Sequence, residues 1–160
     1  MRYTPALALA VVGDLQNALV RAAELGRQGP EDTFVQNNYL PTLRGQIALS
    51  EKDAVKAIEA LQAVKAHELS ANIDPLKLIY VRGQAYLAMH HGDEAVVEFQ
   101  KIVEHRGLVF TSIIGALARL QMGRAYVMLG DTVKARSAYQ DFLTLWKEAD
   151  SDGRIFVSGH

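Results

Sequence analysis

The sequence predicts an all-α fold, an α-solenoid of about four antiparallel helix pairs. The first observation is a returning alanine, because Ala18, Ala57, Ala95 and Ala135 follow one another at intervals of 39, 38 and 40 residues. The second is that a turn signal precedes each alanine by four or fewer residues, and an apolar residue stands four positions after it. Self-similarity at a nearly fixed period marks a repeat array.

Composition agrees with one helical domain and excludes several classes of partner. The 160 residues are enough for a sizeable core, and 49% of them are apolar. The 17 basic and 18 acidic residues nearly cancel and form no long run of one sign, so nucleic acid is not an expected partner. The chain has no cysteine, which excludes disulfides and thiolate metal sites. The apolar run at 6–12 is too short to span a bilayer, so no membrane insertion is expected.

The four helix pairs are expected at about residues 1–28, 32–67, 74–106 and 113–149, followed by an irregular tail at 151–160. The leading helix of the first pair is short, with only about ten residues before Gly13. In the second pair, Pro41 lies inside the first helix, where a proline removes a backbone hydrogen bond. We therefore expect a kink there or a helix that begins late.

The third pair is expected to begin with Asp74 as N-cap and Pro75 at the first helical position. It turns at Gly92-Asp93 and ends at Gly107. The apolar residues at 108–110, which link it to the last pair, must be packed down.

In the fourth pair, Gly130 is expected to end the first helix in a left-handed conformation, and Asp131 to cap the second. One apolar stripe follows at helical spacing. It comprises Tyr139, Phe142, Leu143 and Trp146.

A second column strengthens the repeat. A glycine lies 12 residues before the alanine in three pairs, at Gly45, Gly83 and Gly123, and Tyr86 and Tyr126 follow the last two by three residues. This resembles the tetratricopeptide-repeat pattern of Gly-x2-Tyr in one helix and Ala-x3-Phe in the next. The resemblance implies a right-handed α-solenoid in which small residues stand where two helices cross closely and rings fill the gaps beside them.

The chain also departs from that pattern. Its period is 38 to 40 residues rather than 34, and the usual tryptophan of the first helix is missing. Arg44 and Arg82 stand where a leucine normally precedes the glycine.

At a finer level, residues from about 6 to 150 are similar to the tetratricopeptide region at the C-terminus of bacterial signalling proteins, typically eukaryotic-like serine/threonine kinases or winged-helix regulators. This implies a non-catalytic protein–protein interaction scaffold or sensor segment, excised from a larger protein. It would be cytoplasmic, or periplasmic if attached to a membrane-anchored parent. One alternative is a fragment of a serine/threonine protein kinase whose catalytic domain lies outside this chain. A second is a small-ligand-binding helical repeat domain.

The chain carries no recognisable catalytic or cofactor motif. His105-Arg106-Gly107 lacks the aspartate of a kinase catalytic loop, so a helix C-terminus is expected there. His90 and His91 are adjacent and would point about 100° apart on a helix, so no metal is expected. Glu94 and Glu98 lie one turn apart, and we expect them on an exposed helix face.

The concave face of such an array is the expected binding surface, since solenoids bind partners there. The family's groove positions, carried onto this sequence, suggest a row of amide and guanidinium groups for an extended peptide, flanked by aliphatic surface. The alternative is that these are ordinary exposed helix residues. Self-association through an end of the array is a further expectation, because the last helix carries an apolar stripe and the first pair begins with apolar residues at 6–9. The groove positions are Thr42, Gln46, Leu49, Tyr80, Gln84, Leu87, Leu120, Arg124 and Val127.

Overall fold

The computed structural model describes residues 3–68, 76–105 and 113–151. All regular structure in these residues is helical, which confirms the all-α prediction. The α-helices are α1 (Tyr3–Val12), α2 (Leu15–Gln28), α3 (Leu40–Ser50), α4 (Ala54–Gln62), α5 (Lys77–Ala88), α6 (Gly92–Glu104), α8 (Ile114–Met128) and α9 (Thr132–Ser151).

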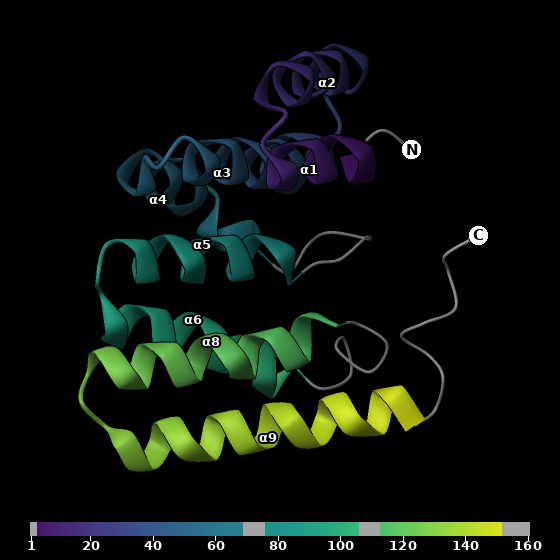
Figure 1. Ribbon diagram of the computed structural model, residues 1–160. Coiled ribbons are helices and arrows are strands. Elements are labelled where there is room, and N and C mark those ends of the chain that lie inside the picture. Colours follow the sequence, from purple (N-terminus) through teal and green to yellow (C-terminus); the bar gives the residue numbers. More distant parts are fainter. Residues whose placement is uncertain (1–2, 69–75, 106–112, 152–160) are drawn as a thin grey trace.

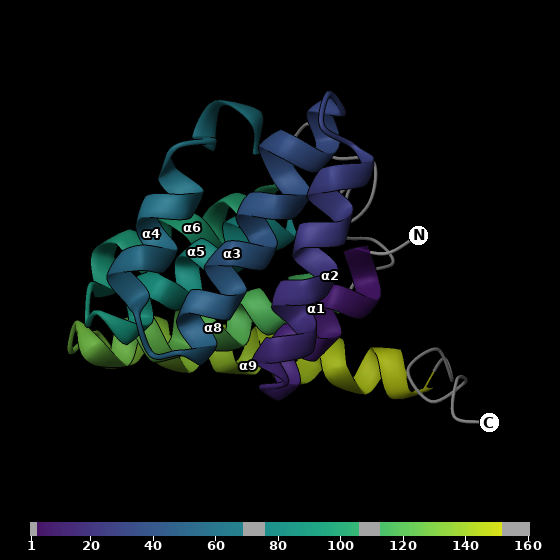
Figure 2. The same ribbon diagram turned by 90° about the horizontal axis from the view of Figure 1, so that it is seen from above.

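The helices follow one another in a stack of pairs (Figure 1). Within the pairs, α1 packs on α2, α3 on α4, α5 on α6, and α8 on α9. Each second helix also contacts the first helix of the next pair, and the first helices contact one another, α1 with α3, α3 with α5, and α5 with α8. Seen from above, α9 runs across the direction of α2 and α3, so the helix direction changes along the stack (Figure 2).

The turn inside every pair has the same backbone geometry. One residue of each turn has a positive φ, and it stands five residues before a returning alanine. The next residue donates its N–H to the carbonyl five residues back, which is the long hydrogen bond of a Schellman motif. The positive-φ residues are Gly13 at 87°, Lys52 at 63°, His90 at 60° and Gly130 at 74°. The left-handed conformation expected of Gly130 is therefore confirmed.

The predicted turn at Gly92-Asp93 was wrong by two residues. His90 adopts the left-handed conformation, and Gly92 is the first residue of α6. Gly92 is needed for a different reason, because Leu129 at the end of α8 lies directly on it. A Cβ placed on Gly92 would be 2.9 Å from Leu129 Cγ. The glycine therefore marks a close approach of two helix pairs.

Aspartates cap the second helices of three pairs. Asp131 accepts a hydrogen bond from the backbone N–H of Lys134 at 3.0 Å, which confirms its predicted role. Asp14 and Asp53 cap α2 and α4 in the same way, whereas His91 at the start of α6 makes no side-chain cap. Of the tail predicted at 151–160, Ser151 is instead the last residue of α9. The rest of the tail lies outside the described residues, as do the predictions for Asp74, Pro75, Gly107 and the link at 108–110.

The helix that contains Pro41 does not begin late, because the chain is already helical at Thr33 and Phe34, but its turn before the proline is irregular. A π-helical turn at Val35–Tyr39 precedes α3, and the N–H of Leu40 donates to the carbonyl of Val35, five residues back. The wider turn accommodates a proline that has no N–H and would crowd the carbonyl four residues before it. At the other end of this pair, α4 ends at Gln62 and only a short 3₁₀ turn, Lys65–His67, reaches the predicted boundary.

The glycine column packs as the sequence predicts. The residue four positions after each returning alanine lies on the glycine of its own pair: Leu61 on Gly45, Phe99 on Gly83 and Tyr139 on Gly123. A Cβ on Gly83 would lie 2.7 Å from Phe99 ring carbons. In the first pair Ala6 occupies this column and is fully buried. Small residues therefore set the close crossing of each pair.

Candidate functional site

Two of the predicted groove residues belong to the core. Thr42 is fully buried, and its hydroxyl donates to the carbonyl of Asn38 at 2.7 Å. Tyr80 is 5% exposed, and its hydroxyl accepts a hydrogen bond from Gln121 Nε2 at 3.1 Å. Neither side chain can line an open groove, so both are removed from the candidate site. Their positions were carried over from the resemblance, which did not show that neighbouring helices cover them.

The other seven residues reach the surface of α3, α5 and α8 to different extents. Arg124 is exposed, and Val127 is 56% exposed. Five are half-buried, and of these Leu49 and Leu87 pack against the core. The five are Gln46, Leu49, Gln84, Leu87 and Leu120. Three polar side chains, Gln46, Gln84 and Arg124, therefore remain at the surface, one on each of α3, α5 and α8. Of these helices, α3 contacts α5, and α5 contacts α8. We call these three residues the row.

A buried polar contact holds one end of this row in place. Arg124 Nη1 donates to Gln121 Oε1 at 3.2 Å, and Gln121 in turn donates to the hydroxyl of Tyr80. Lys77 Nζ lies 5.2 Å from the centre of the Tyr80 ring. Burial raises the pKa of Tyr80, against the opposing effect of the Gln121 hydrogen bond, so the phenol is neutral at physiological pH. Arg124 is therefore presented by a fixed support from α5 and α8.

The largest polar feature is a buried ion cluster that sequence reasoning missed. Arg82 on α5 is fully buried, and its Nη2 donates to Glu98 Oε2 of α6 at 2.6 Å and to Glu68 Oε2. Lys101 Nζ lies 3.3 Å from Glu98 Oε1 and 3.4 Å from Glu68 Oε1. We name Arg82, Glu98, Glu68 and Lys101 the Arg82 cluster.

The expectation that Glu98 lies on an exposed face was wrong, since its residue is 4% exposed. The reason is that the face of α6 that bears Glu98 turns toward α5. The available signal was Arg82 itself, because it stands where the repeat pattern has leucine. A charge at a core column requires a buried partner.

The ion pairs of the Arg82 cluster join separate parts of the chain. All four carboxylate oxygens have a cationic partner, so none is free to act as a base. Burial tends to raise the pKa of Glu68, but the hydrogen bond and charge of Arg82, with Lys101, outweigh it and hold that pKa below its ordinary value. The carbonyl of Glu68 also accepts from Asn38 Nδ2 at 3.4 Å. The cluster therefore ties the second helix pair to the third.

No group of three or more His, Asp or Glu in the described ranges is arranged to hold a metal ion. His105 directly follows α6, and its Nδ1 lies 2.6 Å from the carbonyl oxygen of Lys101, which is the helix-end role expected of it. Among the helices of the described ranges, none is long and apolar enough to cross a membrane.

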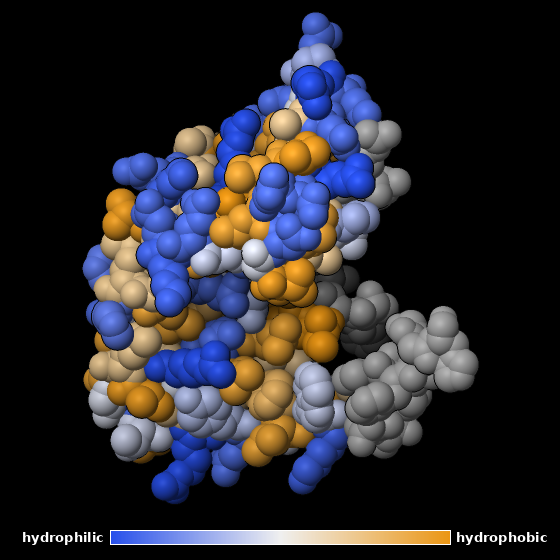
Figure 3. Space-filling model, turned by 45° about the horizontal axis from the view of Figure 1, so that its top comes forward, coloured by the Kyte–Doolittle hydropathy of each residue, from blue (hydrophilic) through white to orange (hydrophobic). Residues whose placement is uncertain are grey.

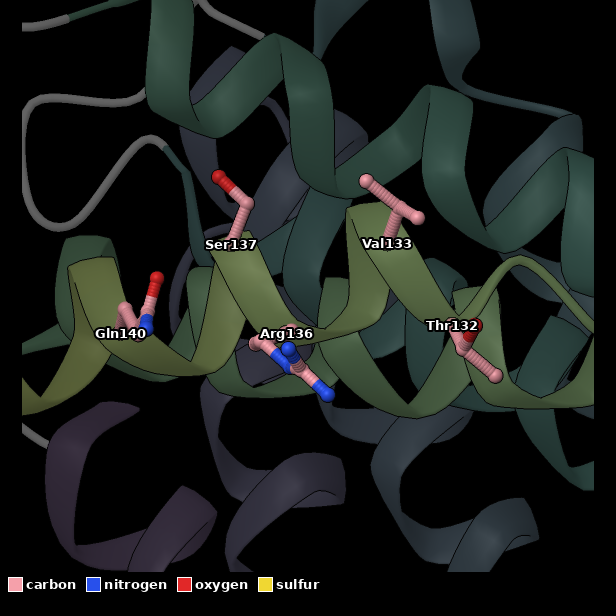
Figure 4. A pocket seen from close by; sticks show the side chains of 5 residues that line it. All are labelled: Thr132, Val133, Arg136, Ser137 and Gln140. Carbon is pink, nitrogen blue, oxygen red and sulfur yellow. The ribbon is translucent and has the colours of Figure 1, made fainter.

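Two hollows are notable on the surface of the residues that the structure describes. A shallow one of about 300 Å³ is lined by side chains of α9 alone, and these spread along the helix rather than converge (Figure 4). A larger one of about 590 Å³ lies where α2, α3 and the start of α4 meet. On the face drawn in Figure 3, apolar side chains form patches from the upper part through the centre to the lower part, with hydrophilic ones between and beside them. The residues of the shallow hollow are Thr132, Val133, Arg136, Ser137 and Gln140.

The apolar stripe of the last helix is largely used within its own pair. Tyr139 lies on Gly123, and Phe142 and Trp146 are half-buried with ring centres 5.5 Å apart. Leu143 is 53% exposed. Self-association through this end stays a prediction.

No model of a known protein family matches the chain, and no curated protein matches its sequence.

Proposed function

We propose that this chain is a tetratricopeptide-like, right-handed α-solenoid that works without catalysis, as a protein–protein interaction scaffold or sensor segment of a larger bacterial signalling protein. The proposal includes a cytoplasmic location. The bound partner is an extended peptide, or an extended segment of a protein, on the surface of the first helices.

One observation carries this proposal. The same turn geometry and the same glycine contact recur along the chain. Gln46, Gln84 and Arg124 stand at equivalent positions, each directly after a column glycine, on α3, α5 and α8, and α5 contacts both of the other two helices. An extended peptide presents backbone N–H and C=O groups at regular intervals, and amide side chains can pair with both. A repeated amide row is therefore suited to a peptide backbone more than to a compact ligand.

The test is a selection of random 12-residue peptides on the purified chain, followed by fluorescence anisotropy with the enriched sequences. The Gln46→Ala/Gln84→Ala variant should weaken binding by about tenfold or more, because both amides leave the centre of the site. Arg136→Ala on α9 is the matched control, since this side chain is exposed and lies outside the row. Equal affinity of both variants, or a selection without enrichment, would contradict the proposal.

A further inference from the structure

The larger hollow lies along the contact between the first and second helix pairs. In the last contact of the stack, α6 meets α8 closely: Leu129 lies on Gly92, and Val96 and Val103 pack against the shared core. The corresponding positions of α2, counted from the returning alanines, include Leu19 and Gly26. These residues line the hollow of about 590 Å³, although Gly26 also lies close to Leu40 of α3, whose Cδ1 would be 3.3 Å from an added Cβ.

The side chains of α2 and α3 explain why a hollow remains between the two helices. Ala23 stands where α6 has Gln100 and is too small to fill the hollow, and Gly26, where α6 has Val103, adds no side chain at all. On the facing helix, Arg44 takes the place of Met122, which is buried in α8. Arg44 is exposed and lines the hollow. A groove therefore remains between α2 and α3, which we name the α2–α3 groove.

The groove has an apolar floor and a basic rim. Leu40 and Ile47 of α3 are buried at its base, and Leu19 of α2 is half exposed at its side. Arg27, Arg44 and Lys56 lie along it, against a single carboxylate, that of Glu51. Glu51 pairs with Lys56 at 3.7 Å, while no side chain in the described ranges forms an ion pair with Arg27 or Arg44. The groove therefore carries surplus positive charge.

Its length separates a helix from a compact ligand. The lining follows α3 and the turn before it from Gln36 to Glu51, about 22 Å at 1.5 Å per residue. The cations are spread along this length rather than gathered at one point. An anionic small molecule would need one charged end, whereas an amphipathic helix presents an apolar stripe with charges repeated beside it.

We propose that the α2–α3 groove docks an acidic amphipathic helix of a partner protein. Its apolar stripe would cover Leu40 and Ile47, and its Asp and Glu side chains would pair with Arg27 and Arg44. This surface is distinct from the row Gln46, Gln84 and Arg124, so the proposal goes beyond the peptide site and stands or falls apart from it.

The experiment is a display library of a stable helical scaffold, in which one stripe is Leu or Ile and the flanking positions are drawn equally from Glu and Lys. Selection uses the full chain. We expect enriched clones to carry mostly Glu at the flanks. Binding should fall at least about tenfold with Arg44→Glu, which reverses a central charge, and with Ala23→Trp, which fills the groove. Both positions are exposed, so circular dichroism should show unchanged unfolding midpoints.

Two controls separate the possible outcomes. Arg136→Glu makes the same charge reversal on α9 and should leave binding unchanged. Gln46→Ala/Gln84→Ala should also leave it unchanged, because these residues belong to the peptide site. The proposal is overturned if Lys-flanked clones are enriched, if no clone is enriched, or if Arg44→Glu and Arg136→Glu weaken binding equally. Loss only in the Gln46/Gln84 variant would assign the helix to the other surface.

Discussion

Replacing both Arg82 and Glu98 should cost less stability than replacing Arg82 alone. The chain itself contains the apolar alternative, because Met122 and Ala138 occupy the corresponding positions of the last pair and are both buried. The perturbation is therefore Arg82→Met, Glu98→Ala, and the two together. These variants give the third helix pair the residues that the fourth pair has at the same positions.

The expected sizes follow from what each change leaves behind. Arg82→Met removes the main partner of a buried Glu98, and Lys101 alone remains 3.3 Å from that carboxylate. We expect a loss of about 3 kcal/mol in the free energy of unfolding, the lower end for a broken buried pair. Glu98→Ala leaves Arg82 with Glu68 and should cost about 2 kcal/mol, one charge-assisted hydrogen bond.

The double variant should lie within about 1 kcal/mol of the original chain, because replacing both partners removes the stranded charge. The Nε and Nη1 groups of Arg82 are buried without a hydrogen-bond partner among the described residues, which further reduces what the cluster contributes.

Urea unfolding followed by far-ultraviolet circular dichroism measures all three free energies. The double-mutant cycle should give a coupling energy of at least about 2 kcal/mol. Arg136→Met is the control for losing an arginine from an exposed helix position, with an expected change within about 0.5 kcal/mol. A double variant as unstable as the sum of the two single changes would refute the reasoning, as would an Arg82→Met variant that unfolds like the control.

Three further outcomes are expected. Gly83→Ala should lower the unfolding free energy by about 1 kcal/mol or more, because overpacking against Phe99 exceeds the gain in helix propensity. Gly26→Ala in α2 should be neutral or stabilising, because the added Cβ would meet only one methyl group, that of Leu40, at 3.3 Å. Equal urea midpoints of the two variants would contradict this expectation. Glu68→Gln should reduce the loss of stability in acid. The pKa of Glu68 is lowered in the folded chain, so its ionised carboxylate stabilises the fold above the ordinary value of 4.5, and this stabilisation is lost as the pH falls below that value. The free energies of unfolding at about pH 6 and about pH 3.5 should therefore differ less in this variant than in the original chain. His90→Gly should raise the unfolding free energy by about 0.5 kcal/mol, since glycine adopts the observed φ of 60° without steric cost; a lower thermal midpoint would count against the left-handed turn.

The sequence identified the features that depend on neighbours in the chain. The turn of the fourth pair was predicted because Gly130 tolerates a positive φ and Asp131 caps the next helix, both local preferences. The irregular turn before Pro41 also follows from the missing N–H of one residue. In the third pair, His90 rather than a glycine has the positive φ of the turn. The prediction placed this turn at Gly92, the nearest glycine, and was wrong by two positions.

The candidate sites show the other side of the comparison. Gln46, Gln84 and Arg124 remain at the surface as predicted, but Thr42 and Tyr80 do not, because a spacing pattern cannot show which helix covers a side chain. The α2–α3 groove had no signal in the sequence. It depends on the small side chains of one helix pair facing the first helix of another.

What the sequence determined by itself is therefore a set of helices, their turns and the column where a small residue meets a large one, because backbone preferences and helical period act over a few residues. Only the tertiary structure decided which polar groups are buried and where a hollow remains between two helix pairs. Glu98 lies 16 positions from Arg82, and Gln121 lies 41 positions from Tyr80. The free energy of a charge or an amide depends on such distant partners, and these meet only when the helix pairs stack.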